Sequence, residues 1–205
     1  MTELIFLILQ IFIIYFSLSF NLFLCLNNNL DLNSFSFSEN IALNSIIFLN
    51  FILIISFFNV NLNTIVICYF LYLLFIILIY LLRFKILFKY NKENLIYGVL
   101  FFFTSFIIFI EVANNLVIGW DAQKFWIYKT LNFYNGNTIT NLSNLPNSWY
   151  PYLGSLAWSF FWKVSFLDSE YSGRLFYVFL YLSSLILLIY NFKISNFYKT
   201  ILFFL

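Results

Sequence analysis

Asp121, in the stretch GWDAQKFWIYKTLNFYNG, is the residue best suited to chemistry. If residues 120–134 form a helix, one narrow face carries the polar side chains of Asp121, Lys124, Tyr128 and Asn132. Residues three or four positions apart are neighbours on a helix, which is why these side chains would line up. A partly buried carboxylate at the mouth of a membrane-facing cavity is placed to take a proton from a hydroxyl. Asp also caps helices well, so a purely structural role stays open.

A second carboxylate, Glu111, lies inside an otherwise apolar run. By the rise of a helix it lies about 10 Å before the outer end of that run. A charge at such a depth is costly unless it faces a cavity or a partner, which makes Glu111 a functional candidate. The alternative is a structural role, in which Asn114 and Asn115 or the later Arg174 cap it.

Arg174 is the third candidate, one turn inside the next apolar run and shortly after Asp168 and Glu170. An Arg in this position can extend its guanidinium to the membrane surface. It can equally pair with Asp168 or Glu170, or bind a lipid phosphate. The sequence leaves these alternatives open.

The composition indicates what must position these residues. Of the 205 residues, 63% are hydrophobic and only 9% are charged, whereas soluble proteins average about 25% charged residues. We therefore predict an integral membrane protein. A net charge of +2 without any basic run excludes nucleic acid as a partner.

The chain contains no histidine, which removes His-based triads and His-ligated metals. Its two cysteines, Cys25 and Cys68, fall within apolar runs where a metal would not normally reach them. We predict no metal site and no cofactor, although a metal requirement of the reaction stays open. Any acid or base chemistry must use carboxylates, Lys or Tyr.

Five apolar runs are long enough to cross about 30 Å of hydrocarbon as helices. They cover residues 4–26, 41–58, 62–82, 95–118 and 172–190, and a sixth begins near Thr200. The predicted fold is all-α, with one polytopic membrane domain over residues 1–205 and a large loop at 119–171. Because the chain ends within the sixth run, we expect it to be the amino-terminal part of a longer protein.

Lys and Arg collect in two connections, RFKILFKYNKEN (83–94) and NFKISNFYK (191–199). Cytoplasmic loops carry such an excess, so the loop 119–171 is predicted to lie outside. Counting spans backwards places the N-terminus outside as well, but the loop 27–40 has no Lys or Arg, so the orientation of the N-terminus stays open. Within the loop, YLGSLAWSFFWKVSF (152–166) would form a helix of about 22 Å, too short to span. We expect this helix to lie in the outer interface, with its Trp residues in the aromatic belt of the membrane.

Taken in order, several motifs resemble the amino-terminal part of the GT-C membrane glycosyltransferases, which include protein mannosyltransferases and the aminoarabinose transferase acting on lipid A. These motifs are a basic connection, a span, GWDAQKFWIYKTLNFYNG, YPYLGSLAWSFFWKV, the acidic DSE and Arg174. The resemblance covers about residues 80–175. The chain departs from the family in NSWYPY, which has one Pro and no His, and in its length, because family members run to several hundred residues.

The resemblance implies a first large external loop with juxtamembrane helices, Asp121 as catalytic base and a polyprenyl-phosphate sugar as donor. Lys124, Lys163 or Arg174 would offset the phosphate charge. The full predicted substrate-binding set is Lys124, Tyr128, Lys163, Glu170, Arg174 and Glu111. Expected partners are membrane lipid and the sugar donor, and the expected location is a bacterial inner (plasma) membrane with the loop 119–171 extracytoplasmic.

Two other classes of function fit the sequence. A transporter or flippase-like protein would use Glu111 and Arg174 in a central polar pathway. A small structural or assembly subunit would need no site. The sugar, the acceptor and the oligomeric state stay open.

Overall fold

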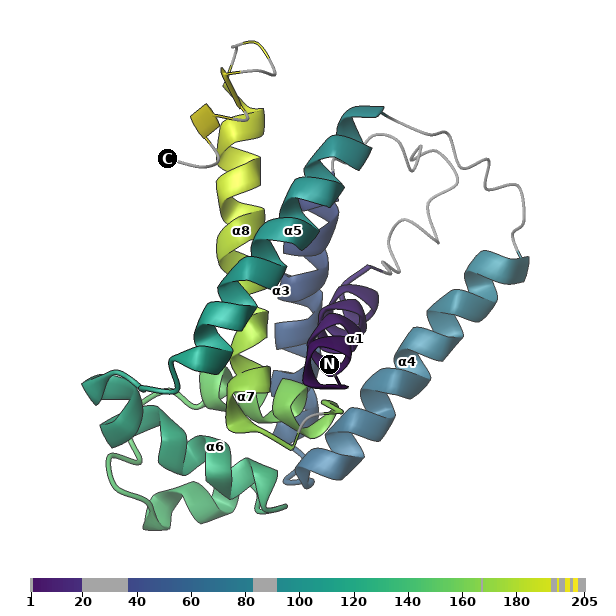
Figure 1. Ribbon diagram of the computed structural model, residues 1–205. Coiled ribbons are helices and arrows are strands. Elements are labelled where there is room, and N and C mark those ends of the chain that lie inside the picture. Colours follow the sequence, from purple (N-terminus) through teal and green to yellow (C-terminus); the bar gives the residue numbers. More distant parts are fainter. Residues whose placement is uncertain are drawn as a thin grey trace.

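The computed structural model describes residues 2–19, 37–82, 92–166, 168–192, 195, 198–199 and 201–202. Throughout these ranges the regular structure is helical and no strand forms, as the sequence predicts (Figure 1). Four of the helices described are long and apolar enough to cross a membrane. They are α3 (Phe37–Ser56), α4 (Leu62–Leu82), α5 (Lys92–Asn114) and α8 (Leu175–Tyr190), the last counted together with the short helix η4 (Glu170–Arg174) that runs into it. The protein is therefore a helical membrane protein.

The first predicted span is shorter than α3, α4, α5 and the combined length of η4 and α8. Helix α1 (Thr2–Ser17) has 16 residues, about 24 Å of helix, which is less than the hydrocarbon thickness. Three carbonyls at its end each accept a hydrogen bond from a side chain of α3 or α4: Ser17 from Tyr69 (2.6 Å), Leu18 from Asn44 (2.7 Å) and Ser19 from Asn40 (3.2 Å). The last carbonyls of a helix lack partners within it, so these donors fix where α1 ends. The remainder of the predicted span, 20–26, lies outside the described residues.

The turn between α3 and α4 lies at the same end of the bundle as the loop that follows α5 (Figure 1). Thr140 of the loop donates a hydrogen bond to Asn59 Oδ1 of the turn at 3.1 Å, and the hydroxyls of Tyr152 and Ser56 share one at 3.2 Å. Asn59 has a φ of 54°, a left-handed conformation that Asn tolerates better than most residues. The two connections thus share one side of the membrane, as alternating spans require.

The basic connection 83–94 lies mostly outside the described residues, as does most of the predicted sixth run. The assignment of this connection to the cytoplasm therefore stays a prediction.

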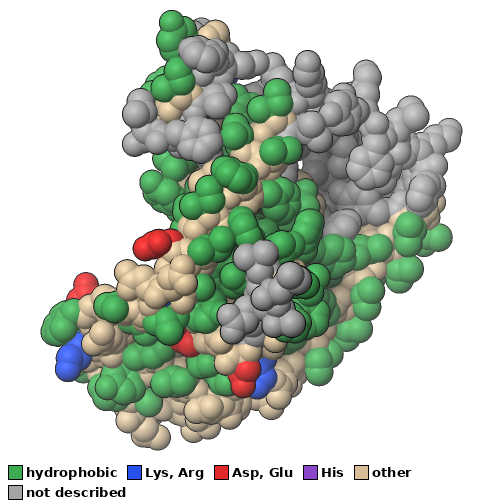
Figure 2. Space-filling view, viewed as in Figure 1, with side chains coloured by type: hydrophobic (Ala, Val, Ile, Leu, Met, Phe, Trp, Pro, Cys, Tyr) green, Lys and Arg blue, Asp and Glu red, His purple; other side chains and the backbone are tan. Residues whose placement is uncertain are grey.

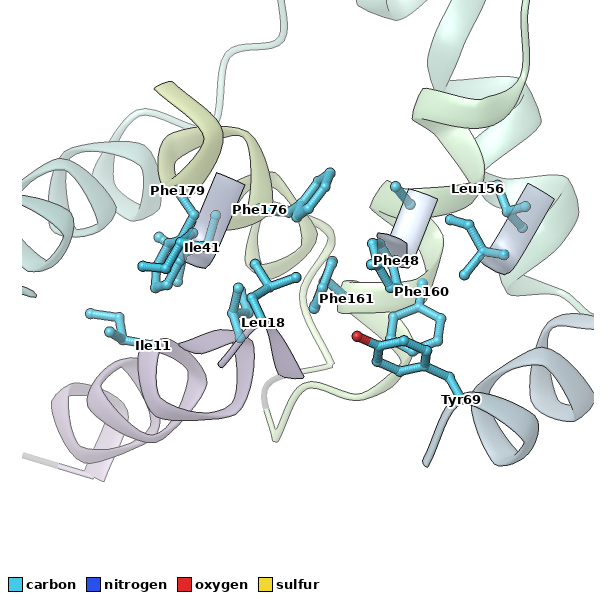
Figure 3. Packing of buried hydrophobic residues seen from close by; sticks show 14 of the residues in the cluster. Ile11, Leu18, Ile41, Phe48, Tyr69, Leu156, Phe160, Phe161, Phe176 and Phe179 are labelled. Atoms are coloured by element: carbon cyan, nitrogen blue, oxygen red, sulfur yellow. The ribbon is translucent and has the colours of Figure 1, made fainter. Parts of the chain in front are cut away.

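Phe48 of α3 is the centre of the core, where α3, α4, α7 (Leu153–Lys163) and α8 meet. Four rings surround it at centroid distances of 4.9 to 5.5 Å: Tyr69, Phe160, Phe161 and Phe176 (Figure 3). Three of them are edge-on and one is tilted, and edge-on contacts are an arrangement that aromatic quadrupoles favour. Because the rings come from four helices, this cluster fixes α7 against the ends of the spans.

The outward faces of the spans are apolar. On α5, Val99, Phe103 and Ile107 recur every four residues and are exposed, so they form one stripe along the helix. Figure 2 shows hydrophobic side chains along the spans wherever the surface is described, whereas the charged side chains gather over the end of α5 and the loop after it. This division fits a bundle in lipid that carries a polar cap at one end.

Candidate functional site

The polar segment after α5 begins earlier than the sequence predicts. Helix α5 ends at Asn114 rather than 118, and residues 115–119 are not helical. The Asn115 side chain accepts a hydrogen bond from the Val117 amide at 3.4 Å. Asn side chains compete for backbone groups in this way and favour the ends of helices, which explains the early end of α5.

The early end of α5 corrects the depth of Glu111. This residue lies three positions before the end of the helix, or about 4.5 Å along it, rather than about 10 Å. It continues the exposed stripe of α5, four residues after Ile107. A carboxylate so near the end of a span can reach headgroups or water, so its position demands no buried partner.

The helix predicted over 120–134 does form. It starts at Trp120, passes through the π-helical turn η2 (Ala122–Trp126) and continues as α6 (Ile127–Tyr134). Among the described residues, Asp121 has no hydrogen-bond or ion-pair partner, and its side chain makes no capping bond. It is exposed, not partly buried as predicted. The carboxylate is thus free for chemistry.

The predicted polar face is correct for three of its four members. Lys124 and Tyr128 are exposed together with Asp121. Asn132 is buried, because the chain turns back after α6 and the Asn132 amide donates a hydrogen bond to the Thr138 carbonyl at 3.3 Å. The exposed part of the face therefore consists of one carboxylate, one ammonium group and one phenol.

Helix α6 is tied to α7 through the residue that ends the π-helical turn. The Trp126 carbonyl accepts hydrogen bonds from the hydroxyls of Thr130 and Ser155, both at 3.0 Å. Ser159, one turn further along α7, donates to the Thr130 carbonyl at 2.7 Å. Single π-helical turns occur often at functional sites, and here the turn directly follows Asp121.

Helix α7 has 11 residues and is too short to span, as the sequence predicts, but protein rather than lipid surrounds it. Its residues Ser155–Phe161 are all buried, because α6 covers one side and the ends of α3, α4 and α8 cover the other (Figure 1). Trp158 is only 6% exposed and donates a hydrogen bond to the Glu170 carbonyl at 3.2 Å. Trp162 stacks on Tyr134 at a centroid distance of 3.8 Å. Both Trp residues therefore belong to the protein core or its margin and not to an aromatic belt.

At the far end of the loop, Arg174 is fully engaged. Its guanidinium binds both carboxylate oxygens of Glu170, one of them at 2.8 Å, and lies 5.7 Å from the Trp158 ring. A further N–H points to the Leu116 carbonyl at 3.5 Å. Of the alternatives left by the sequence, the geometry favours pairing with Glu170. Glu170 and Arg174 are thus together, whereas neither Glu111 nor Asp121 joins them.

Gly173, beside Arg174, allows this end to pack tightly. A Cβ placed on it would overlap the Trp158 carbonyl oxygen and lie 2.6 Å from Trp158 Cδ1. Real Cβ atoms do not come so close, so only glycine lets η4 press against α7.

A second cluster joins α6 to the segment after α7. The Tyr134 hydroxyl donates a hydrogen bond to Asp168, and the Lys163 ammonium lies 4.5 Å from the Tyr134 ring centroid. The hydrogen bond to Asp168, with burial and the charge of Asp168 adding to it, raises the pKa of Tyr134 to about 12. Lys163 is exposed, so it could reach a substrate, but its ammonium contacts the Tyr134 ring.

Sequence reasoning missed Lys129, the most unusual cation in the loop. Its side chain is 0% exposed, its ammonium donates to the Tyr150 carbonyl at 2.6 Å, and the rings of Trp126 and Tyr150 are each 5.9 Å away. Burial lowers its pKa. Its position in the sequence could have indicated this burial. Lys129 lies three residues after Trp126 and four before Phe133, so it shares the apolar face of α6 with them.

A groove of about 470 Å³ opens between α1 and α4, lined by Leu9, Phe12, Ile13, Phe16, Phe70, Val164 and Phe166. All seven side chains are apolar, and Asp121 is not among them. In the part of the chain that the structure describes, no three His, Cys, Asp or Glu side chains gather as metal ligands. Comparison with protein-family models, curated proteins and solved structures gave no match to this chain.

Proposed function

We propose that the full-length protein is a membrane glycosyltransferase of the GT-C type, which moves a sugar from a polyprenyl-phosphate donor to an acceptor hydroxyl. The observation that carries this proposal is the free state of Asp121. Its carboxylate is exposed, uncapped and unpaired among the described residues, yet it is mounted on a helix that hydrogen bonds fix to α7. A base needs this combination of a free carboxylate and a rigid support.

In the proposed reaction, Asp121 accepts the proton of the acceptor hydroxyl. The hydroxyl oxygen forms a bond to the anomeric carbon while the bond from that carbon to the phosphate oxygen breaks. The electron pair leaves with the polyprenyl phosphate, whose charge requires a cation. Lys124 is the best candidate because it is exposed on the same face as Asp121, whereas Arg174 is already held by Glu170.

The apolar groove supports a lipid-linked donor. A polyprenyl chain requires a channel without polar groups, and the seven side chains between α1 and α4 provide one. Lys163 directly precedes Val164, which lines this groove. Lys163 is nevertheless a weaker candidate for the phosphate than Lys124, because its ammonium lies 4.5 Å from the Tyr134 ring centroid.

A structural or assembly subunit is the second candidate function. It is favoured by the separation of the predicted site residues, because Glu170 and Arg174 neutralise each other and Glu111 lies on the outward face of α5. A transporter or flippase-like function has less support, since Glu111 and Arg174 would have to line a common pathway.

The test is sugar transfer by membranes containing the full-length protein, supplied with a panel of radiolabelled polyprenyl-phosphate sugars. We expect Asp121→Asn to lower the rate by about 10²- to 10⁴-fold, the usual contribution of a positioned base. Asp168→Asn is the matched control, because an amide oxygen can still accept the Tyr134 hydrogen bond, and it should keep the wild-type rate.

Wild-type transfer with an unaffected Asp121→Asn variant would show that Asp121 is not the base. If the full-length protein transfers none of the sugars, while a tagged copy copurifies with a defined membrane complex that its deletion disrupts, the subunit function is correct.

A further inference from the structure

An exposed, mainly aromatic surface includes the neighbours of Asp121 in the sequence. We define the aromatic edge as Leu116, Val117, Trp120, Phe125, Trp149 and Tyr150. Trp120 is 65% exposed, and Val117 and Trp149 are each 77% exposed. Large apolar side chains so exposed and so close together indicate a contact surface.

The aromatic edge is held in place by ring contacts. The ring centroids of Phe125 and Tyr150 lie 4.5 Å apart in a stacked arrangement, and those of Trp120 and Phe125 lie 5.7 Å apart. The Trp149 ring lies 6.2 Å from that of Tyr150. The stack of Phe125 on Tyr150 joins two segments that are far apart in the sequence, and the other two contacts each lie within one of these segments.

Two hydrogen bonds also connect the helix that begins at Trp120 to the segment around Tyr150. The buried Lys129 ammonium donates to the Tyr150 carbonyl at 2.6 Å, and the Asn147 amide donates to the Lys124 carbonyl at 3.4 Å. The exposure of the edge is therefore a fixed feature of the fold, and a partner meets a preformed surface.

The position of the edge relative to the spans identifies the partner. The stripe of Val99, Phe103 and Ile107 on α5 faces lipid, and Glu111 continues it at the depth where a charge becomes tolerable. The edge begins only five residues later, at Leu116. In Figure 1, residues 115–126 extend sideways beyond α5 and α8 at the end of the bundle, so this part of the loop overhangs the bilayer beside the spans.

The residue types also fit the surface of a bilayer. Trp and Tyr prefer the headgroup level, where the ring is in an apolar layer and the polar atom is in a wet one. Asp121 and Lys124 are exposed between the aromatic side chains and would lie among the headgroups. Trp and Tyr are also common in protein–protein contacts, so it is the direct continuation of the exposed apolar stripe of α5 that favours lipid as the partner.

We propose that the aromatic edge is inserted into the headgroup layer of the bilayer and that its partner is phospholipid. The belt predicted for Trp158 and Trp162 is thereby assigned to Trp120 and Trp149. This surface would hold residues 116–150 at a fixed depth. The inference depends on the spans and not on glycosyl transfer, so either proposal can fail alone.

Quenching of Trp fluorescence by brominated phospholipid tests this proposal on the full-length protein in vesicles. Bromine close to the ester end of the acyl chain should quench the wild-type protein, and bromine close to the methyl end should quench it less. The double variant Trp120→Phe/Trp149→Phe should lose most of this quenching. Both positions are exposed, so the variant should fold like the wild type.

Trp158→Phe is the matched control, since Trp158 is buried against Glu170 and η4 and its loss should leave the lipid quenching unchanged. Equal bromine quenching of the wild type and the double variant would overturn the proposal. It would also be overturned if aqueous acrylamide, but not bromine, quenched Trp120 and Trp149, because the edge would then be in water. Protection of both from bromine and acrylamide would mean that protein covers the edge.

Discussion

The two ends of the loop carry similar residue types but differ in how these residues are used. At the first end, Asp121 and Lys124 are exposed and have no ionic partner among the described residues. At the second end, Glu170 and Arg174 bind each other, and Trp158 covers the pair. A charge that the fold has already neutralised supports structure, whereas an unpaired charge on a rigid helix is available to a substrate. We therefore expect substitutions at the second end to affect stability and substitutions at the first end to affect activity.

The largest stability effect is expected at Gly173. In Gly173→Ala, the new Cβ would overlap the Trp158 carbonyl oxygen, so η4 and α7 must separate. We expect the free energy of unfolding to fall by about 3 kcal/mol, at the upper end of the range for overpacking. The midpoint of thermal unfolding in detergent should fall accordingly, and size-exclusion chromatography can follow the loss of folded protein.

Gly119→Ala is the control for this substitution at the first end. A Cβ there meets no heavy atom within 4 Å, so the midpoint should stay within experimental error of the wild type. Equal effects of the two substitutions would contradict the close packing of η4 on α7.

A smaller effect is expected from Arg174→Ala. The variant leaves the half-buried Glu170 carboxylate without a cation and removes the contact with Trp158. We expect the free energy of unfolding to fall by about 2 kcal/mol, a value between those for exposed and buried ion pairs. Arg174→Lys should recover only part of it, because an ammonium group cannot bind both carboxylate oxygens in the geometry of a guanidinium.

Lys124→Ala removes a cation from the first end and should change stability by less than about 0.5 kcal/mol, as is usual for exposed positions. If it destabilised the protein as much as Arg174→Ala, Lys124 would have a structural partner and the contrast between the two ends would be wrong.

The smallest effect concerns pH. The raised pKa of Tyr134, about 12, means that the folded protein keeps the phenol proton at a pH where the unfolded chain has lost it. The hydrogen bond to Asp168 therefore contributes fully below the ordinary tyrosine pKa of about 10, and its contribution is lost as the pH rises toward 12.

Tyr134→Phe should accordingly be less stable than the wild type at neutral pH, and the difference should shrink as the pH rises through this window. Unfolding midpoints measured over the alkaline range would show it. Tyr128→Phe, an exposed tyrosine on the same helix, should follow the wild-type profile at every pH. A constant difference between Tyr134→Phe and the wild type would mean that Asp168 does not hold the phenol proton.

The sequence predicts the fold where the physical signal is local. The lengths of apolar runs identify α3, α4, α5 and α8, and the spacing of polar residues identifies the helix that carries Asp121. Even the choice of partner for Arg174 has a local signal, since Glu170 is four residues before it, the favourable order for a helical ion pair.

Other features depend on parts of the chain that meet only in the folded protein. An apolar helix with two Trp residues looks the same whether lipid or protein surrounds it, so the burial of α7 under α6 was not predicted. The burial of Lys129 depends on residues 145–151 folding over α6. The end of α1 depends on Asn40, Asn44 and Tyr69 from later helices.

Side-specific labelling tests the central claim that the unpaired Asp121 is accessible from the outer side of the membrane. In a full-length variant without Cys25 and Cys68, single cysteines at positions 121 and 59 are exposed to a membrane-impermeant maleimide in intact cells. We predict that both react, because the turn between α3 and α4 shares a side with the loop, and that a cysteine at position 89 reacts only after the membrane is opened. If the cysteine at position 121 reacted only after the membrane was opened, as the one at position 89 should, Asp121 would not lie on the outer side.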